Sequence, residues 1–348
     1  MSCSTKEFFI GATTGSGYTS CCDDVFENAE RIYIVKGAPG TGKSHLMKEL
    51  SLCRSEETEI FYCSSDHRSI DALWFPKKKI CITDGTSPHA KDTKIPGIRD
   101  ELVDLGRFWD SEVLLESKKE IAELTKAKTE GYKRIFSSLS LLGRLKCAEN
   151  EILSDYLNKE KMNAAADRLV KRIGAKKGNI LFRQTLSVGM HGINSLDTFK
   201  RLSEISFDID GRYGSGSCFC DAVLRSAKEN QVEVWVSRDP LRATEPCSVF
   251  FPGSNAMVEI KNGENDDTKE RSTKIINMER FIPSPRLGSS KACLKQIERT
   301  RNEFIKTVLK DFEKVRDAHF GLEKIYGRAM DFKAVTKYTK ELSKTIFS

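Results

Sequence analysis

Apolar and polar residues alternate over residues 31 to 36, and the alternation stops at Gly37. From Ser44 the apolar residues recur at helical spacing, from Leu46 through Leu50. Alternation with a period of two is typical of a half-buried strand, whereas spacing of three to four residues is typical of an amphipathic helix. The pattern therefore predicts a strand, a tight loop and a helix, in this order.

Two further apolar runs, EIFYCSSD at 59 to 66 and KKKICITDG at 77 to 85, have small residues and an aspartate at their ends. Strands that alternate with helices favour a parallel sheet. Charged segments with helical apolar spacing cover residues 112 to 173, and the glycines of GAKKGN then indicate a linker. We expect an α/β fold with two domains, residues 1 to 175 and 176 to 348, each with charged helical extensions.

The loop after the first strand, GAPGTGKS, fits the pattern GxxxxGK[ST] of a Walker A phosphate-binding loop. Backbone N–H groups of such a loop, at the start of a helix, bind phosphate oxygens through aligned dipoles. We expect the Lys43 ammonium to contact the β- and γ-phosphates and the Ser44 hydroxyl to bind Mg²⁺. The predicted nucleotide-binding residues are Gly37, Ala38, Pro39, Gly40, Thr41, Gly42, Lys43, Ser44 and His45.

Asp84 closes the third apolar strand, where a carboxylate is suited to hold Mg²⁺ as a Walker B residue. Gly85 follows it, at the position where motor-type ATPases carry a glutamate, so we expect slow hydrolysis. No NKxD or TKxD string for guanine recognition occurs, which makes ATP with Mg²⁺ the expected ligand. We predict that Lys43 and Asp84 are catalytic and that Ser44 and Asp84 bind the metal.

Two other polar side chains near strand ends are candidates for the same site. Asp66 is a candidate general base, although an Asx turn or a helix N-cap explains an aspartate there as well. His89, near Thr86 and Ser87, is a candidate contact for the γ-phosphate, and the alternative is a histidine in a surface loop.

The second half of the chain repeats the order of motifs found in the first. Gly192 and Gly211 correspond to Gly17 and Gly37 at nearly the same offset, and VSRD and EIKNG follow where the first half has CSSD and CITDG. A repeat that keeps its order over several elements indicates a tandem duplication. We therefore predict two tandem P-loop NTPase-like domains with parallel sheets.

The second glycine-rich loop, GRYGSGSC, lacks the groups that handle charge. Ser217 replaces the lysine, Cys218 replaces the hydroxyl residue, and Asn262 stands where Asp84 stands in the first half. A charge-assisted contact contributes roughly 1.5 to 3 kcal/mol, so its loss weakens an anion site. The glycines are still required by the strand-to-helix turn. We predict that only the N-terminal site binds nucleotide.

Composition and charge limit the kinds of binding partner and the cellular compartment that we expect for this chain. The formal net charge is +7, with no basic run interleaved with aromatics, so nucleic acid is not indicated as a partner. No apolar run is long enough for a membrane helix and the start lacks a secretory signal, so we expect a cytoplasmic protein. The 11 cysteines are scattered, which favours reduced thiols, and without a CxxC pair we expect no protein-bound zinc.

At KGAPGTGKSHLMKEL, YCSSDHRSIDALWFP and ITDGTSPHAKDTKIPGIRDELVDLGRFWD the chain resembles a bacterial family of tandemly duplicated P-loop NTPases, predicted ATPases without an established physiological role. The resemblance covers essentially the whole chain. It implies a cytoplasmic P-loop fold in both halves, with nucleotide bound by the first loop, Lys43, Ser44 and Asp84. The second loop of the family is usually intact, so GRYGSGSC departs from its pattern.

Two enzymatic functions fit these features. The first is a slow Mg²⁺-dependent ATPase whose nucleotide state changes the packing of the two halves. The alternative is a small-molecule kinase, with Asp66 as the base, the helices of residues 112 to 173 as a lid, and Arg134 or Arg144 on the transferred phosphoryl group.

A third reading is an interaction protein. The altered second half would then be a docking surface for an unidentified protein partner, with Arg212 or Arg238 directed toward the first site.

Overall fold

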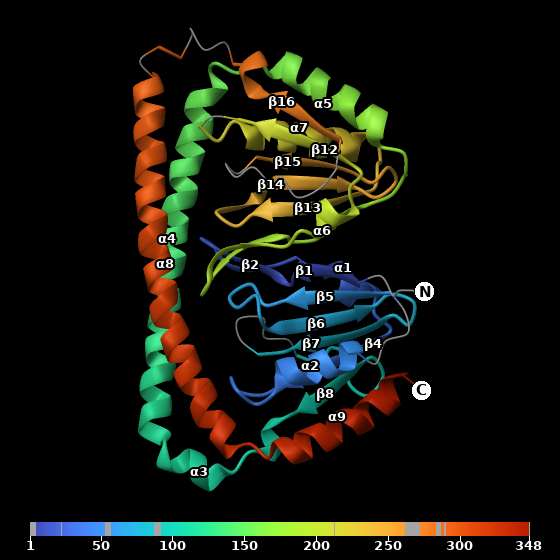
Figure 1. Cartoon of the computed structure of the whole chain (residues 1–348), viewed down its shortest axis with the longest axis vertical. Helices are drawn as coiled ribbons and strands as arrows, with labels where there is room; N and C mark the ends of the chain where they lie inside the picture. Colours follow the sequence, from blue (N-terminus) through green and yellow to red (C-terminus); the bar gives the residue numbers. More distant parts are fainter. Residues whose placement is uncertain are drawn as a thin grey trace.

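Two six-stranded sheets follow one another along the chain (Figure 1). The structure is a computed structural model that describes residues 5–21, 23–52, 57–86, 92–211, 213–261, 272–282, 287–288 and 290–347. The first sheet has the order β1-β5-β6-β7-β4-β8 and contains β1 (Thr5–Phe9), β4 (Arg31–Lys36), β5 (Thr58–Tyr62), β6 (Ile70–Phe75), β7 (Ile80–Asp84) and β8 (Asp100–Asp104). The second has the order β9-β13-β14-β15-β12-β16 and contains β9 (Ile180–Phe182), β12 (Ile205–Asp210), β13 (Val234–Asp239), β14 (Arg242–Phe251), β15 (Ala256–Ile260) and β16 (Ser272–Asn277).

The two sheets have the same topology, strand for strand. In each half, an antiparallel hairpin and a short helix follow the first strand of the six-stranded sheet. The next strand of that sheet, β4 or β12, is followed by a longer helix. These elements are β2 (Gly11–Thr14), β3 (Gly17–Ser20), α1 (Asp23–Asn28) and α2 (Lys43–Leu52), then β10 (Leu186–Gly189), β11 (Gly192–Ser195), α6 (Thr198–Leu202) and α7 (Gly216–Glu229). The halves thus share one arrangement of elements.

The expected α/β class is confirmed, but the expectation of parallel sheets was wrong. β6 runs antiparallel to both β5 and β7, and β14 runs antiparallel to both β13 and β15. The segments between β5, β6 and β7 are too short for the crossover of a dozen or more residues that a parallel connection needs. The remaining pairs of the first sheet, β1 with β5 and β4 with β7 and β8, are parallel.

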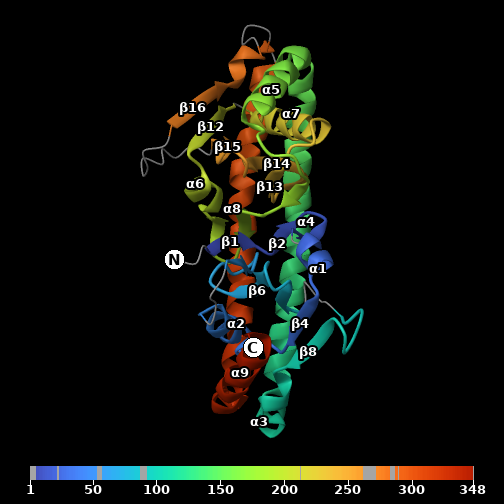
Figure 2. The same cartoon turned by 90° about the vertical axis from the view of Figure 1, so that its right-hand side faces the viewer.

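Two long helices, α4 (Lys118–Ser154) and α8 (Ser290–Ala329), lie side by side in opposite directions along both sheets (Figures 1 and 2). At 1.5 Å per residue the 37 residues of α4 extend about 55 Å, enough to pass both sheets. Ile135 and Leu139 of α4 share a buried cluster with Val308 and Phe312 of α8.

The helices that follow this pair are exchanged between the halves. α5 (Lys159–Ile173) packs on α7 of the second half, where Leu169 and Phe219 share a core, and α9 (Phe332–Phe347) packs on α2 of the first half, where Leu342 and Leu46 share a core. The boundary predicted at residue 175 lies between β8 and β9, so it divides the strands of the two sheets. It leaves α5 and α9, however, each on the opposite side of the boundary from the sheet that it covers. Within the described ranges, the other named helices are α3 (Ser111–Glu116), η1 (Gly106–Phe108) and η2 (Met278–Arg280).

The two sheets also share a core where their edges meet. Phe8 of β1 and Phe61 of β5 belong to the same buried cluster as Trp235 of β13 and Phe250 of β14. The rings of Phe8 and Trp235 meet edge to face at 6.0 Å. None of the helices in the described part of the chain combines the length and the apolar character of a membrane span.

Candidate functional site

The glycine loop, defined as residues 37 to 44, connects β4 to α2 as the sequence pattern predicts. Gly40 and Gly42 have φ angles of +80° and +90°, in the left-handed region that glycine adopts without a steric penalty. The Thr41 hydroxyl donates to the carbonyl oxygen of Ala38 at 2.8 Å and holds the turn closed. The loop therefore delivers the chain into the N-terminus of α2, where backbone N–H groups are free of intrahelical partners.

Lys43 lies folded over this loop. Its Nζ donates to the carbonyl oxygens of Gly37 at 2.8 Å and Ala38 at 2.9 Å, and it lies 3.8 Å from Oδ2 of Asp84. The side chain of Lys43 is only 12% exposed. An ammonium group is thus held in a shielded position at the loop, available to an incoming anion that can replace the carbonyl oxygens.

Asp84 ends β7 beside the loop, because β7 pairs with β4 in a register that sets Asp84 opposite Val35. Its Oδ1 accepts from the backbone N and the hydroxyl of Thr86, at 2.8 and 2.6 Å, so that Oδ2 is directed at Lys43. Burial raises the pKa of the Asp84 carboxyl, and the Lys43 charge opposes this shift. A shielded carboxylate of this kind is suited to hold a hydrated Mg²⁺ ion.

The predicted loop residues, except for the buried Thr41, line a cavity of about 660 Å³. This volume lies within the range of roughly 300 to 1,000 Å³ that is usual for ligand sites. Ser44, the predicted metal ligand, is part of the wall, and its Oγ accepts the backbone N–H of Ile70 at 2.9 Å. The rest of the described lining comes from both halves and consists of Cys63, Ser65, Asp66, Ser69, Asp71, Asp84, Thr86, Lys128, Tyr132, Met190, His319, Glu323, Gly327 and Phe332.

Sequence reasoning missed the helical side of this cavity. Lys128 and Tyr132 are four residues apart on α4, and His319 and Glu323 are four apart on α8, so each pair shares one helix face. Burial lowers the pKa of Lys128, whose Nζ lies 3.3 Å from Nδ1 of His319. The four-residue spacing can be seen in the sequence, but no local sequence pattern shows which edge of the sheet these two helix faces contact.

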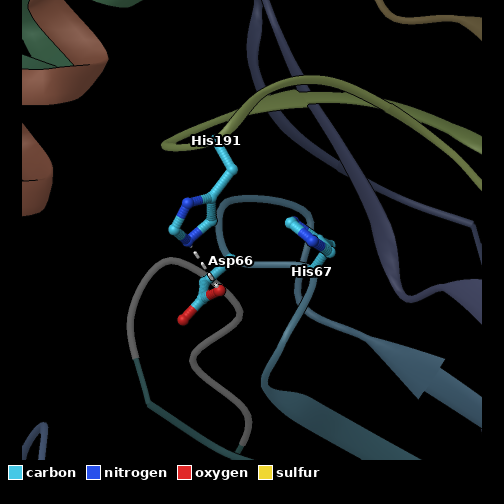
Figure 3. Close-up of side chains that lie close together, drawn as sticks. All are labelled: Asp66, His67 and His191. Atoms are coloured by element: carbon cyan, nitrogen blue, oxygen red, sulfur yellow. Dashed lines mark ion pairs between the residues drawn. The ribbon is translucent and has the colours of Figure 1, made fainter.

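Asp66, the predicted base, does line this cavity, on the loop between β5 and β6. Its Oδ1 lies 3.2 Å from Nε2 of His191, which belongs to the second half (Figure 3). Arg134 lies instead beside Asp311 at 3.8 Å, and neither it nor Arg144 is among the described residues of the cavity wall.

The other candidates do not join the site. Arg238 stacks its guanidinium over the Phe182 ring at 3.5 Å and is not part of the described wall. Ser87, His89, Arg212 and Asn262 lie outside the described residues.

The second glycine loop, of which residues 211 and 213 to 218 are described, is covered by charged side chains from the long helices. Glu149 of α4 approaches Gly214 and is bonded to Arg301 of α8 at 3.1 Å. Asn150 donates to the Ser217 hydroxyl at 3.4 Å, and Ser217 is 2% exposed.

A buried ion pair extends this cover. Lys146 of α4 is paired with Asp239, which ends β13. Among the described residues, the cavity that touches this loop, at Tyr213 and Ser215, measures about 40 Å³. That space is far below the usual size of a ligand site.

Comparison with protein-family models, curated proteins and solved structures found no match to this chain.

Proposed function

We propose that the chain is a P-loop protein that binds Mg²⁺-ATP at the glycine loop of its first half and hydrolyses it slowly. The resemblance to a duplicated family of predicted P-loop ATPases supports nucleotide binding at this loop. The observation that supports this most directly is the Lys43–Asp84 pair, separated by 3.8 Å at the wall of a 660 Å³ cavity. In a phosphate-binding loop, the lysine neutralises the phosphate oxygens and the aspartate holds the metal. Both groups are held beside the N-terminus of α2 before any ligand arrives.

The choice of ATP and of slow turnover comes from the sequence. Neither guanine-recognition string occurs, and Gly85 follows Asp84, so a carboxylate base is missing from its usual position. The eight described cysteines are free thiols, in keeping with a cytoplasmic location, which is part of the proposal.

A role as a nucleotide switch is supported by the position of α8. The carbonyl oxygen of Glu323 packs against Gly40 so closely that a Cβ on Gly40 would overlap it. Phosphate binding at the loop therefore acts on a helix that also carries Arg301, over the second glycine loop. A shift of α8 would be transmitted to the other half, because packed helices tend to move as rigid elements.

The decisive experiment is calorimetric titration of the full chain with Mg²⁺-ATP. We expect one nucleotide per chain, with affinity lowered at least about tenfold in Lys43→Ala, because each charge-assisted contact contributes roughly 1.5 to 3 kcal/mol. Ser217→Ala is the matched control in the second loop and should bind as the unmodified chain does. Equal affinity in Lys43→Ala and the unmodified chain would overturn the proposal.

One observation supports the kinase alternative. Asp66, its candidate general base, lines the same cavity as Lys43. Incubation of the chain with γ-labelled ATP and a panel of small hydroxyl compounds separates the two functions. A kinase transfers the label to an acceptor, whereas an ATPase releases labelled phosphate alone.

A further inference from the structure

Asp66, His67 and His191 converge at the junction of the two halves (Figure 3). Asp66 and His67 belong to the loop between β5 and β6, and His191 lies at the turn between β10 and β11. One ligand atom from each residue can be chosen so that all three lie within 4.8 Å of one another. The two imidazole rings lie 5.0 Å apart, centroid to centroid, and meet edge to face.

Two nitrogen atoms of this cluster have no hydrogen-bond partner among the described residues. Nδ1 of His67 and Nε2 of His191 are both buried, and neither forms a hydrogen bond, although Nε2 approaches the Asp66 carboxylate to 3.2 Å. Buried polar atoms in native proteins are nearly always satisfied, and an exception calls for a group such as an ion.

The backbone holds the three groups in place. The N–H of Met190 donates to the carbonyl oxygen of Ser65 at 2.8 Å, and the Ser187 hydroxyl donates to that of Ser64 at 2.5 Å. A Cβ on Gly189 would come within 2.5 Å of the Ser65 oxygen, so this close approach requires glycine. The hairpin of the second half is therefore fixed on the loop that carries Asp66 and His67, and this preorganises the cluster.

We propose that Asp66, His67 and His191 bind one divalent transition-metal ion of the Zn²⁺ type. Two imidazoles and a carboxylate suit Zn²⁺ and its first-row neighbours, whereas Mg²⁺ prefers oxygen ligands alone. Three protein ligands leave a position for water or a further ligand. Since Asp66 lines the nucleotide cavity, that position is reached from the same space.

This inference goes beyond the proposed ATPase, because the ion is distinct from the Mg²⁺ expected at Ser44 and Asp84. It differs from the expectation of no protein-bound zinc, which rested on the spacing of ligands along the chain. A carboxylate bound to a metal is not free to act as a general base, so the inference weighs against Asp66 as the base of a kinase.

The test is titration of the full, chelator-treated and nucleotide-free chain with Zn²⁺ in the presence of excess Mg²⁺. We expect one tight equivalent, and affinity lower by more than about 100-fold in His67→Gln and in His191→Gln, because even outer hydrogen-bond partners of ligands contribute about 10- to 100-fold. His319→Gln, in the wall of the same cavity but outside the cluster, is the matched control and should bind Zn²⁺ as the unmodified chain does.

A spectroscopic measurement keeps the test valid if a variant folds poorly. Co²⁺ bound to the unmodified chain should give visible d–d bands without the sulfur-to-metal charge-transfer band of a cysteine site. The absence of Zn²⁺ binding, unchanged binding in both histidine variants that retain the far-UV circular dichroism of the parent, or a thiolate band with Co²⁺ would each overturn the proposal.

Discussion

Arg183 and Asp24 are joined by two hydrogen bonds of 2.9 Å, from Nη1 to Oδ1 and from Nη2 to Oδ2. Arg183 follows β9 in the second half and Asp24 lies in α1 of the first, so this fork-to-carboxylate contact connects the halves. The same guanidinium donates from Nε to the buried Glu59 of β5 at 3.0 Å. A bidentate, shielded pair of this kind is among the stronger polar contacts in proteins.

Arg183→Met should destabilise the protein by about 3 to 5 kcal/mol, because it leaves the Glu59 carboxylate buried without its partner. Urea unfolding measures this loss. Arg225→Met is the control, since Arg225 and Asp221 form a half-exposed pair that contributes at most about 1 kcal/mol. Similar losses of unfolding free energy in the two variants would show that the buried contact stabilises the protein no more than the half-exposed one.

The loss in Arg183→Met should depend on pH. Burial raises the pKa of the Glu59 carboxyl and Arg183 opposes this shift, so removing Arg183 raises the folded-state pKa further. A raised folded pKa means that stability is lost as pH increases through that value, starting from the unfolded value of about 4.3. The destabilisation should therefore be smaller near about pH 5 than near about pH 8, and the reverse order would contradict this reading.

Gly40→Ala should lower both stability and nucleotide affinity. Residue 40 has a φ of +80°, and its new Cβ would overlap the backbone oxygen of Glu323, which a helix cannot easily move. We expect about 1 to 2 kcal/mol of backbone strain and about 1 to 3 kcal/mol from overpacking. Urea unfolding and titration with Mg²⁺-ATP measure the two effects.

Gly17→Ala provides the comparison for Gly40→Ala. Gly17 has a φ of +105° with no atom within 4 Å of an added Cβ, so only the backbone strain applies. If the two alanine variants are equally stable, the contact between α8 and the glycine loop is looser than the structure indicates.

Ser217→Lys restores the missing lysine of the second glycine loop, yet it should not create a second nucleotide site. Ser217 is 2% exposed and the Glu149–Arg301 pair already covers this loop at Gly214, so the new ammonium would have to be buried. We expect one nucleotide per chain and a loss of about 3 kcal/mol or more in stability. A second equivalent of bound ATP would refute the idea that this site is closed.

Leu342→Ala in α9 should destabilise the first sheet by about 2 to 5 kcal/mol, although residue 342 lies in the second half of the sequence. Its side chain is 5% exposed and shares a core with Leu46 and Leu50 of α2. For the same reason a fragment of residues 1 to 175, which lacks α9, should not unfold cooperatively. A sigmoidal thermal transition of that fragment, with a native near-ultraviolet spectrum, would contradict the exchange of helices.

Local elements of this protein follow from the order of its residues. The alternation at 31 to 36, the break at Gly37 and the helical spacing after Ser44 predict β4, the glycine loop and α2, and all three are found. The segment IDALWF, which forms β6, escaped prediction because it is a short apolar run between two turns. Because this strand was missed, a mixed sheet was predicted to be parallel. A strand that is added without a crossover helix runs antiparallel to the strand before it.

The sequence by itself determined where strands, glycine turns and amphipathic helix faces lie, because these depend on backbone conformation and on spacing over a few residues. Only the tertiary structure decided that α5 and α9 are exchanged, and that His191 of one half faces Asp66 and His67 of the other. An apolar helix face in the sequence predicts that the face is buried, but it does not predict which element it packs against. Contacts between residues far apart in the chain are selected by packing of the whole molecule, which no local pattern contains.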